Sequence, residues 1–113
     1  MARFKQKQVC LLANLGGFEA KMEENLELGK SYGQSVYSLT GDGLVKVGER
    51  APVPVNLVAL SPGELLVWSS LINEQIQALG FDKDNVVILA AGRNYRGTIP
   101  LGTALEKGIR IGA

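Results

Sequence analysis

The chain has 113 residues, 46% of them hydrophobic, and its 12 basic and 11 acidic side chains give a net charge of +1. This length suits one domain over residues 1–113, and the charge gives no general attraction to nucleic acid or membranes. The chain has no histidine and one cysteine, which excludes the usual Cys/His zinc sites, histidine-based catalysis and an internal disulfide. The apolar stretch near the N-terminus is too short for a membrane span or signal peptide, so we expect a cytoplasmic protein.

The first third of the chain predicts a strand, a helix and a second strand. Residues 8–13 form a continuous apolar run, as in strands that are covered on both faces. Cys10 lies in this run, and we expect it to pack in the core, because no activating partner for a nucleophile is evident. After a glycine turn, residues 19–30 predict a helix ending before Gly33, with its acidic residues early and Lys30 late. Residues 35–39 predict the second strand.

The middle of the chain contains the clearest helix signal. Residues 44–47 predict a short strand or a loop, and Pro52 and Pro54 keep the next segment out of the centre of a sheet. Residues 55–60 are interpreted as extended or as an edge strand. Ser61 and Glu64 then have capping-box spacing, so a helix is predicted over 62–79. Trp68 lies on its apolar stripe, which favours a core position or a subunit contact, and Gly80 ends the helix.

The last third predicts another buried strand over residues 85–90. A short helix is expected from about Tyr95, although Gly97 and Pro100 weaken it, and residues 109–111 predict a short final strand. Strands and helices therefore alternate along the chain. This order predicts a single α/β domain with a mostly parallel sheet flanked by helices.

The strongest candidate site follows the strand over residues 85–90. There the chain reads Gly92-Arg93-Asn94-Tyr95-Arg96. Ligands usually bind at the carboxyl ends of strands in open α/β sheets. The guanidinium groups are suited to a phosphate or a carbonyl edge, and a tyrosine ring can stack on a base. The alternative is that the arginines are solvated residues at the start of a helix and the tyrosine packs on the sheet.

Two more glycine-containing turns follow predicted strands. The turn Thr40-Gly41-Asp42-Gly43 lets backbone N–H groups approach an anion, with Asp42 available to a base edge or a sugar; the alternative is a plain hairpin bend. The turn that starts at Asn14 precedes a helix, so its amides are placed to face a phosphate, although a plain turn is also compatible with the pattern. If all strands are parallel, the three turns lie along one edge and line one cleft.

The acidic residues Glu19, Glu23, Glu24 and Glu27 are interpreted as a solvated helix face. Catalytic paired carboxylates are the alternative, but nothing in the sequence places them near another site. The basic residues Arg3, Lys5 and Lys7 near the N-terminus are interpreted as solvated rather than as a nucleic-acid contact.

Three segments in order resemble the YaaA-like proteins, which by fold lie near the uracil-DNA-glycosylase-like proteins. Residues 37–45 (YSLTGDGLV) are similar to the pattern ILSAxxGLV, residues 64–68 (ELLVW) place a tryptophan in the second turn of a helix, and residues 86–96 (VVILAAGRNYR) are similar to VVxLAGxxYR. The resemblance covers about residues 20–112. It implies an α/β fold and binding of, or action on, nucleobases, nucleosides or DNA.

These observations leave three functional hypotheses. The first is non-catalytic binding of a nucleotide-like anionic ligand without a cofactor or metal, as in a phage protein that sequesters a nucleotide signal, and a shallow cleft would then favour a homo-oligomer. The second is an enzyme that acts on a nucleobase or N-glycosidic bond, with Asp42 as base or oxocarbenium stabiliser and Arg93 or Asn94 holding the ligand. The third is DNA binding, which the near-neutral charge disfavours.

Overall fold

Strand β1 (Lys7–Asn14) is the central strand of a five-stranded sheet in the computed structural model, which describes residues 7–48, 53–94 and 96–106. The strands have the order β3-β2-β1-β4-β5. Their bounds are Gly33–Thr40 for β2, Gly43–Lys46 for β3, Val86–Ala91 for β4 and Arg96–Pro100 for β5. The helices are α1 (Met22–Tyr32), α2 (Pro62–Ala78) and α3 (Leu101–Glu106), with 3-10 turns at Phe18–Lys21, Leu57–Ala59 and Lys83–Asn85.

The sheet is mixed, which corrects the prediction of a mostly parallel sheet. Strand β1 pairs in parallel with β2 and with β4, whereas the edge strands β3 and β5 pair antiparallel with their neighbours. The reason is that β3 and β5 each follow their partner through a short turn, and a short turn can join only antiparallel strands. The carboxyl ends of β1, β2 and β4 still meet at one edge of the sheet.

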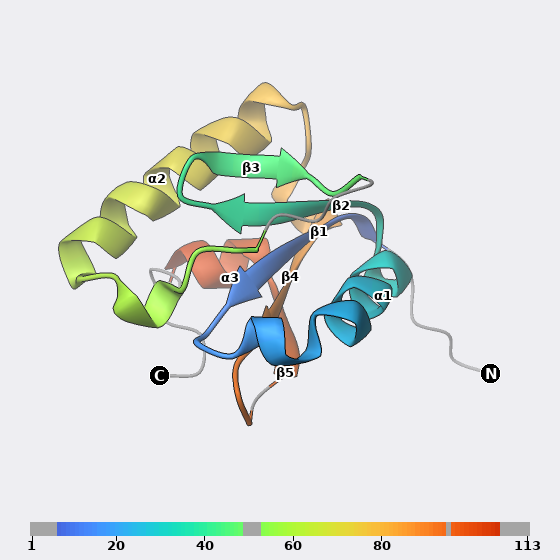
Figure 1. Cartoon of the computed structure of the whole chain (residues 1–113). Helices are drawn as coiled ribbons and strands as arrows, with labels where there is room; N and C mark the ends of the chain where they lie inside the picture. The colour runs from blue at the N-terminus through green and yellow to red at the C-terminus, as the bar shows by residue number, and fades with distance from the viewer. Residues whose placement is uncertain (1–6, 49–52, 95, 107–113) are drawn as a thin grey trace.

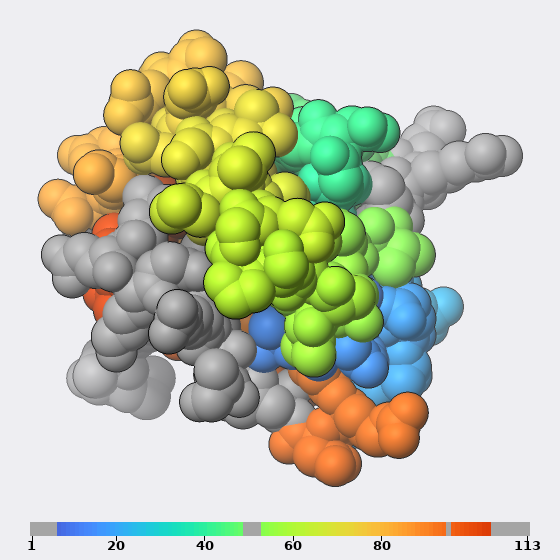
Figure 2. Space-filling model, turned by 90° about the vertical axis from the view of Figure 1, so that its left-hand side faces the viewer, coloured from blue at the N-terminus to red at the C-terminus, as the bar shows by residue number. Residues whose placement is uncertain are grey.

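Helices cover both faces of the sheet (Figure 1). Helix α1 packs on one face with Cys10, Leu12, Phe18 and Leu89, whereas α2 and α3 contribute to the cluster on the other face, which includes Trp68. Figure 2 shows the atoms of α2, yellow-green to yellow, in front of the strands. Coverage of both faces explains the continuous apolar runs in β1 and β4. The prediction of an α/β domain whose sheet is flanked by helices is therefore confirmed.

Helix α2 begins where the sequence predicts. The Ser61 hydroxyl accepts the backbone N–H of Glu64 at 3.2 Å, and the Glu64 carboxylate accepts the N–H of Ser61 at 3.0 Å, which confirms the capping box. Trp68 is buried, and its indole N–H donates to the carbonyl of Thr40 at 3.3 Å, so the core interpretation of this residue is confirmed. Gly80 follows with a φ of 78°, a left-handed conformation that suits glycine.

The helix predicted from about Tyr95 is wrong, because residues 96–100 form β5. This strand pairs from Arg96 with Ala91 to Pro100 with Val87. It is an edge strand, where a terminal proline costs no ladder hydrogen bond and Gly97 is tolerated. Helix α3 starts only at Leu101. The strand predicted at 109–111 lies outside the described residues.

The remaining elements fall near their predicted positions. The segment 44–47, for which a strand and a loop were both open, contains strand β3. The helix predicted over 19–30 begins with the 3-10 turn Phe18–Lys21 and then continues as α1. Residues 55–60 form only an isolated parallel bridge from Asn56 to Asn14, followed by the 3-10 turn Leu57–Ala59. Within the described residues, no helix is long and apolar enough to cross a membrane.

Candidate functional site

The loop after β1 packs against the turn after β4. The Leu15 N–H donates to the Ala91 carbonyl at 2.9 Å, which extends the β1–β4 pairing past the last strand residues. A Cβ atom added to Gly17 would lie 2.7 Å from Arg93 Cα, so the two backbones touch at a point that only glycine allows. In Figure 2 the orange atoms of the turn after β4 adjoin the blue atoms that follow β1. The first and third predicted turns are therefore neighbours.

Asn14 organises the loop after β1 from within. Its Oδ1 accepts the backbone N–H groups of Gly16, Gly17 and Phe18 at 2.8, 3.1 and 3.2 Å. Its Nδ2 donates to the Glu19 carboxylate and, at 3.2 Å, to the Pro54 carbonyl. The residue is 3% exposed. The Oδ1 and Nδ2 atoms of Asn14, which was predicted to bind a ligand, thus both form hydrogen bonds within the protein. Asn14 thereby fixes the loop after β1.

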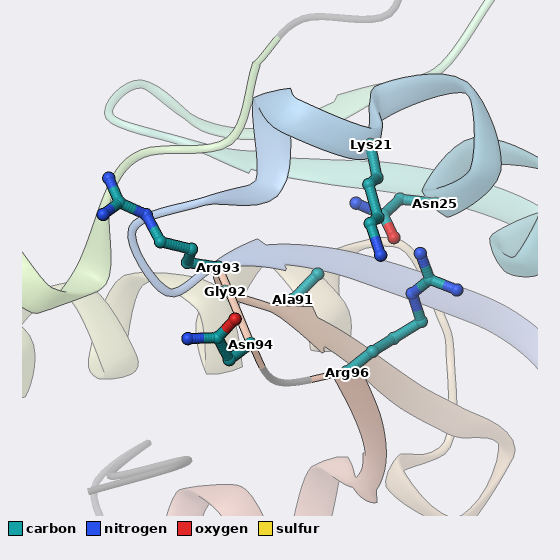
Figure 3. Close-up of a pocket in the computed structure, with 7 residues that line it drawn as sticks. All are labelled: Lys21, Asn25, Ala91, Gly92, Arg93, Asn94 and Arg96. Atoms are coloured by element: carbon teal, nitrogen blue, oxygen red, sulfur yellow. The ribbon is translucent and has the colours of Figure 1, made fainter.

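A pocket of about 300 Å³ opens between the start of α1 and the turn after β4, and we call it the basic pocket. It is lined by Lys21, Asn25, Ala91, Gly92, Arg93, Asn94 and Arg96 (Figure 3). Four of the predicted site residues are therefore brought together: Gly92, Arg93, Asn94 and Arg96. Tyr95 lies outside the described residues. Lys21 and Asn25 are additional residues that the sequence patterns did not single out.

The two arginines of the basic pocket point in different directions. Figure 3 shows Arg96 turned toward Lys21 and Asn25, whereas Arg93 extends away from all three. The alternative of two arginines at the start of a helix is wrong, because Arg96 begins strand β5 and Arg93 lies in the turn before it. The cationic lining closest to α1 therefore comes from Lys21 and Arg96.

Arg96 forms an ion pair with Glu24, a residue of α1 that does not itself line the basic pocket. Its Nη2 lies 2.8 Å from Glu24 Oε2, and the side chains of Arg96 and Glu24 are 32% and 65% exposed. The hydrogen bond from Arg96, together with its charge, lowers the pKa of the Glu24 carboxyl. Glu24 is therefore ionised at neutral pH and offsets part of the charge that Arg96 offers to an anion.

Replacing Glu24 with glutamine is expected to strengthen anion binding in the basic pocket. Exposed ion pairs are weak, so freeing Arg96 should improve the affinity for adenosine 5′-monophosphate by no more than about fivefold. Calorimetric titration at low salt measures this change. Glu74→Gln on α2 is the matched control, because it removes the same charge from an exposed position away from the pocket. Equal gains in the two variants would contradict a specific effect of Glu24.

Asn25 contributes a buried amide to the wall of the pocket. It is 1% exposed, and its Nδ2 donates to the Phe18 carbonyl at 3.1 Å. Its Oδ1 has no hydrogen-bond partner among the described residues. Leaving a buried acceptor unpaired costs about 1–3 kcal/mol, so such a group calls for an explanation. The sequence signal for it is a single asparagine among the charged residues of the helix predicted over 19–30.

The turn after β2 lies apart from the basic pocket. The Thr40 hydroxyl donates to the Gly43 carbonyl at 2.8 Å and accepts the Asp42 N–H at 3.2 Å. Gly41 lines a separate apolar groove with Trp68 and other residues of α2. Thr40, Gly41 and Asp42 therefore form the turn of the β2–β3 hairpin, as the hairpin interpretation predicts. Gly43 follows with a φ of 105°.

Residues 54–56 separate this turn from the other two. The Val55 N–H donates to the Leu39 carbonyl at 2.9 Å, while Asn56 bridges to Asn14. The segment therefore inserts between the ends of β2 and β1, whose own pairing stops at Leu12 and Ser38. Among the described residues, the predicted arrangement of the three turns is therefore found only in part. The turns after β1 and β4 touch, and the second of these lines the basic pocket, whereas the turn after β2 faces α2.

The other chemical candidates have structural roles. Cys10 is buried, and burial raises the pKa of its thiol to about 12, which leaves it protonated at neutral pH. The four acidic residues Glu19, Glu23, Glu24 and Glu27 are exposed, as predicted, although two of them also bind Asn14 and Arg96. No three His, Cys, Asp or Glu side chains within the described part of the chain lie close enough together to hold a metal ion.

Comparisons of this chain with protein families, with curated proteins and with solved structures give no match. The resemblance to YaaA-like proteins therefore stays a prediction from the three short motifs.

Proposed function

We propose that the protein binds a nucleotide-like anionic ligand in the basic pocket without transforming it. The observation that carries this proposal is that one pocket at the carboxyl end of β4 is lined by Lys21, Arg96 and Asn25, whose buried amide oxygen is unpaired. Cationic side chains suit a phosphate, whereas a buried acceptor suits a neutral donor. A nucleotide carries both groups. The pocket volume of about 300 Å³ is at the small end of ligand sites, which favours a mononucleotide.

The location of the pocket also supports this proposal. Ligands of open α/β sheets bind outside the carboxyl ends of the strands. The basic pocket lies at that edge, and the loop after β1 is held in place there by the hydrogen bonds of Asn14. That loop packs against the turn after β4, which lines the pocket, and a turn held in place reduces the ordering cost of binding.

The enzymatic alternative has less support. That hypothesis required Asp42 beside Arg93 or Asn94, and Asp42 lies in the exposed β2–β3 turn and not in the lining of the basic pocket. DNA binding is not favoured either, because the chain has a net charge of only +1. Sequestration of a nucleotide signal, as by a phage protein, is the role that we propose for binding without catalysis. The predicted homo-oligomer and cytoplasmic location stay predictions.

A double variant tests the proposal directly. Lys21→Gln combined with Arg96→Gln is expected to weaken binding of adenosine 5′-monophosphate at least about tenfold, because hydrogen bonds to charged groups contribute about 1.5–3 kcal/mol each. Isothermal titration calorimetry against linear and cyclic nucleotides measures the effect. The matched control is Lys83→Gln, which removes an exposed lysine near the opposite end of β4. Absence of any nucleotide binding below about 1 mM by the unmodified protein would refute the proposal.

A further inference from the structure

The orientation of the Asn25 amide oxygen is fixed by the hydrogen bond that the amide nitrogen of the same side chain forms. The Nδ2 group donates to the Phe18 carbonyl at 3.1 Å, so this hydrogen bond assigns the nitrogen and leaves the oxygen on the other branch. In Figure 3 the oxygen lies on the side of the amide that faces Arg96. A rotation that exchanged the two atoms would place two carbonyl oxygens against each other. The acceptor therefore lies on the Arg96 side of a residue that lines the basic pocket. The oxygen itself is buried, so a ligand donor reaches it only when the neighbouring side chains move.

The cations beside Asn25 do not satisfy this oxygen. Arg96 donates its Nη2 to Glu24 at 2.8 Å. Lys21 lines the same pocket at an exposed position, and no hydrogen bond joins it to Asn25 Oδ1, which has no partner among the described residues. Lys21 and Arg96 are also the groups that the phosphate of a bound nucleotide would engage. The acceptor is thus left for a different part of the same ligand.

We propose, on the basis of the proposed function, that Asn25 Oδ1 receives a neutral N–H or O–H donor of the bound nucleotide. The site then selects nucleotides that carry this donor over simple phosphate anions. A buried acceptor discriminates strongly, since a ligand without the donor leaves it desolvated and unpaired. The donor is either the amino group of the base or a hydroxyl of the sugar, and the two sources are separable with analogues.

A series of four ligands tests this selectivity on the unmodified protein. The ligands are adenosine 5′-monophosphate, purine riboside 5′-monophosphate without the amino group, 2′,3′-dideoxyadenosine 5′-monophosphate without sugar hydroxyls, and inorganic phosphate. One of the two nucleotide analogues is expected to bind at least about tenfold more weakly than adenosine 5′-monophosphate, and that analogue identifies the donor. Inorganic phosphate is expected to bind more weakly than adenosine 5′-monophosphate.

The variant Asn25→Leu removes the acceptor and keeps a side chain that branches at Cγ. It is expected to bind adenosine 5′-monophosphate and the weaker analogue with equal affinity, because the coupling between donor and acceptor is lost. Asn73→Leu is the matched control, since Asn73 on α2 also has an unpaired Oδ1 but does not line the basic pocket. It should keep the discrimination of the unmodified protein. If Asn25→Leu does not fold, the ligand series on the unmodified protein still decides.

The possible outcomes separate this inference from the proposed function. Equal binding of all three nucleotides would overturn the role of Asn25 and leave nucleotide binding intact. Inorganic phosphate binding as tightly as the nucleotides would also overturn it. A complete lack of nucleotide binding would overturn the proposed function and this inference together. Discrimination that persists in Asn25→Leu would show that another group receives the donor.

Discussion

Gly17→Ala is expected to lower the free energy of unfolding by about 2–3 kcal/mol and to weaken nucleotide binding. A Cβ atom at this position would lie 2.7 Å from both Arg93 Cα and the carbonyl carbon of Gly92. These are backbone atoms, so no side-chain rotation relieves the overlap. The loop after β1 and the turn after β4 must move apart, and the second of these lines the basic pocket. The midpoint of urea unfolding, followed by circular dichroism, measures the loss of stability.

Gly63→Ala provides the comparison for this substitution. Gly63 lies in the first turn of α2, and an added Cβ atom there meets nothing within 4 Å. Alanine favours a helix over glycine by up to about 1 kcal/mol, so this variant should be neutral or slightly more stable. A Gly17→Ala protein with an unchanged unfolding midpoint would show that the two loops do not pack as described.

The elements that the sequence predicts well are those whose signals are local. Ser61 and Glu64 specify the start of α2 through a capping box, and the structure contains both hydrogen bonds. The strands β1 and β4 are continuous apolar runs because helices cover both faces of the sheet. In each case the residues that determine the element lie within it, so the prediction needs no knowledge of distant contacts.

Strand β5 was missed because its stabilisation is not local. Gly97 and Pro100 weaken any regular element when considered alone, and an apolar period is hard to recognise in five residues. The strand forms because β4 supplies the hydrogen-bond partners and because an edge position tolerates the proline. The same limitation explains the wrong expectation of a mostly parallel sheet, since parallel or antiparallel pairing of an edge strand depends on how short the preceding turn is.

The candidate site shows the same division between local and long-range information. The carboxyl ends of β1 and β4 were identified as one edge, and four predicted residues line the basic pocket there. The insertion of residues 54–56, which separates Asp42 from that pocket, depends on hydrogen bonds to β1 and β2 that no sequence pattern reveals. Lys21 and Asn25 were overlooked because each resembles an ordinary residue of an amphipathic helix.

Asn14→Ala is expected to be among the most destabilising substitutions in the chain, with a loss of about 3 kcal/mol. The side chain binds three backbone N–H groups, and Phe18, which carries one of them, is fully buried. Alanine leaves that N–H without a partner, and an unpaired buried donor costs about 1–3 kcal/mol before the other lost bonds are counted. Thermal and urea unfolding of the variant measure the loss.

Two further variants separate the hydrogen bonds of Asn14 from its size. Asn14→Asp keeps an acceptor for the three N–H groups but places a second carboxylate against Glu19 and a carbonyl, so an intermediate loss is expected. Asn94→Ala removes an exposed asparagine from the same edge and should change stability by less than about 0.5 kcal/mol. Asn94 lines the basic pocket and Asn14 does not. The nucleotide affinities of Asn94→Ala and Asn14→Asp can therefore be compared as well as their stabilities. If Asn14→Ala were as stable as Asn94→Ala, the hydrogen bonds of Asn14 would not be what holds the loop beside the pocket.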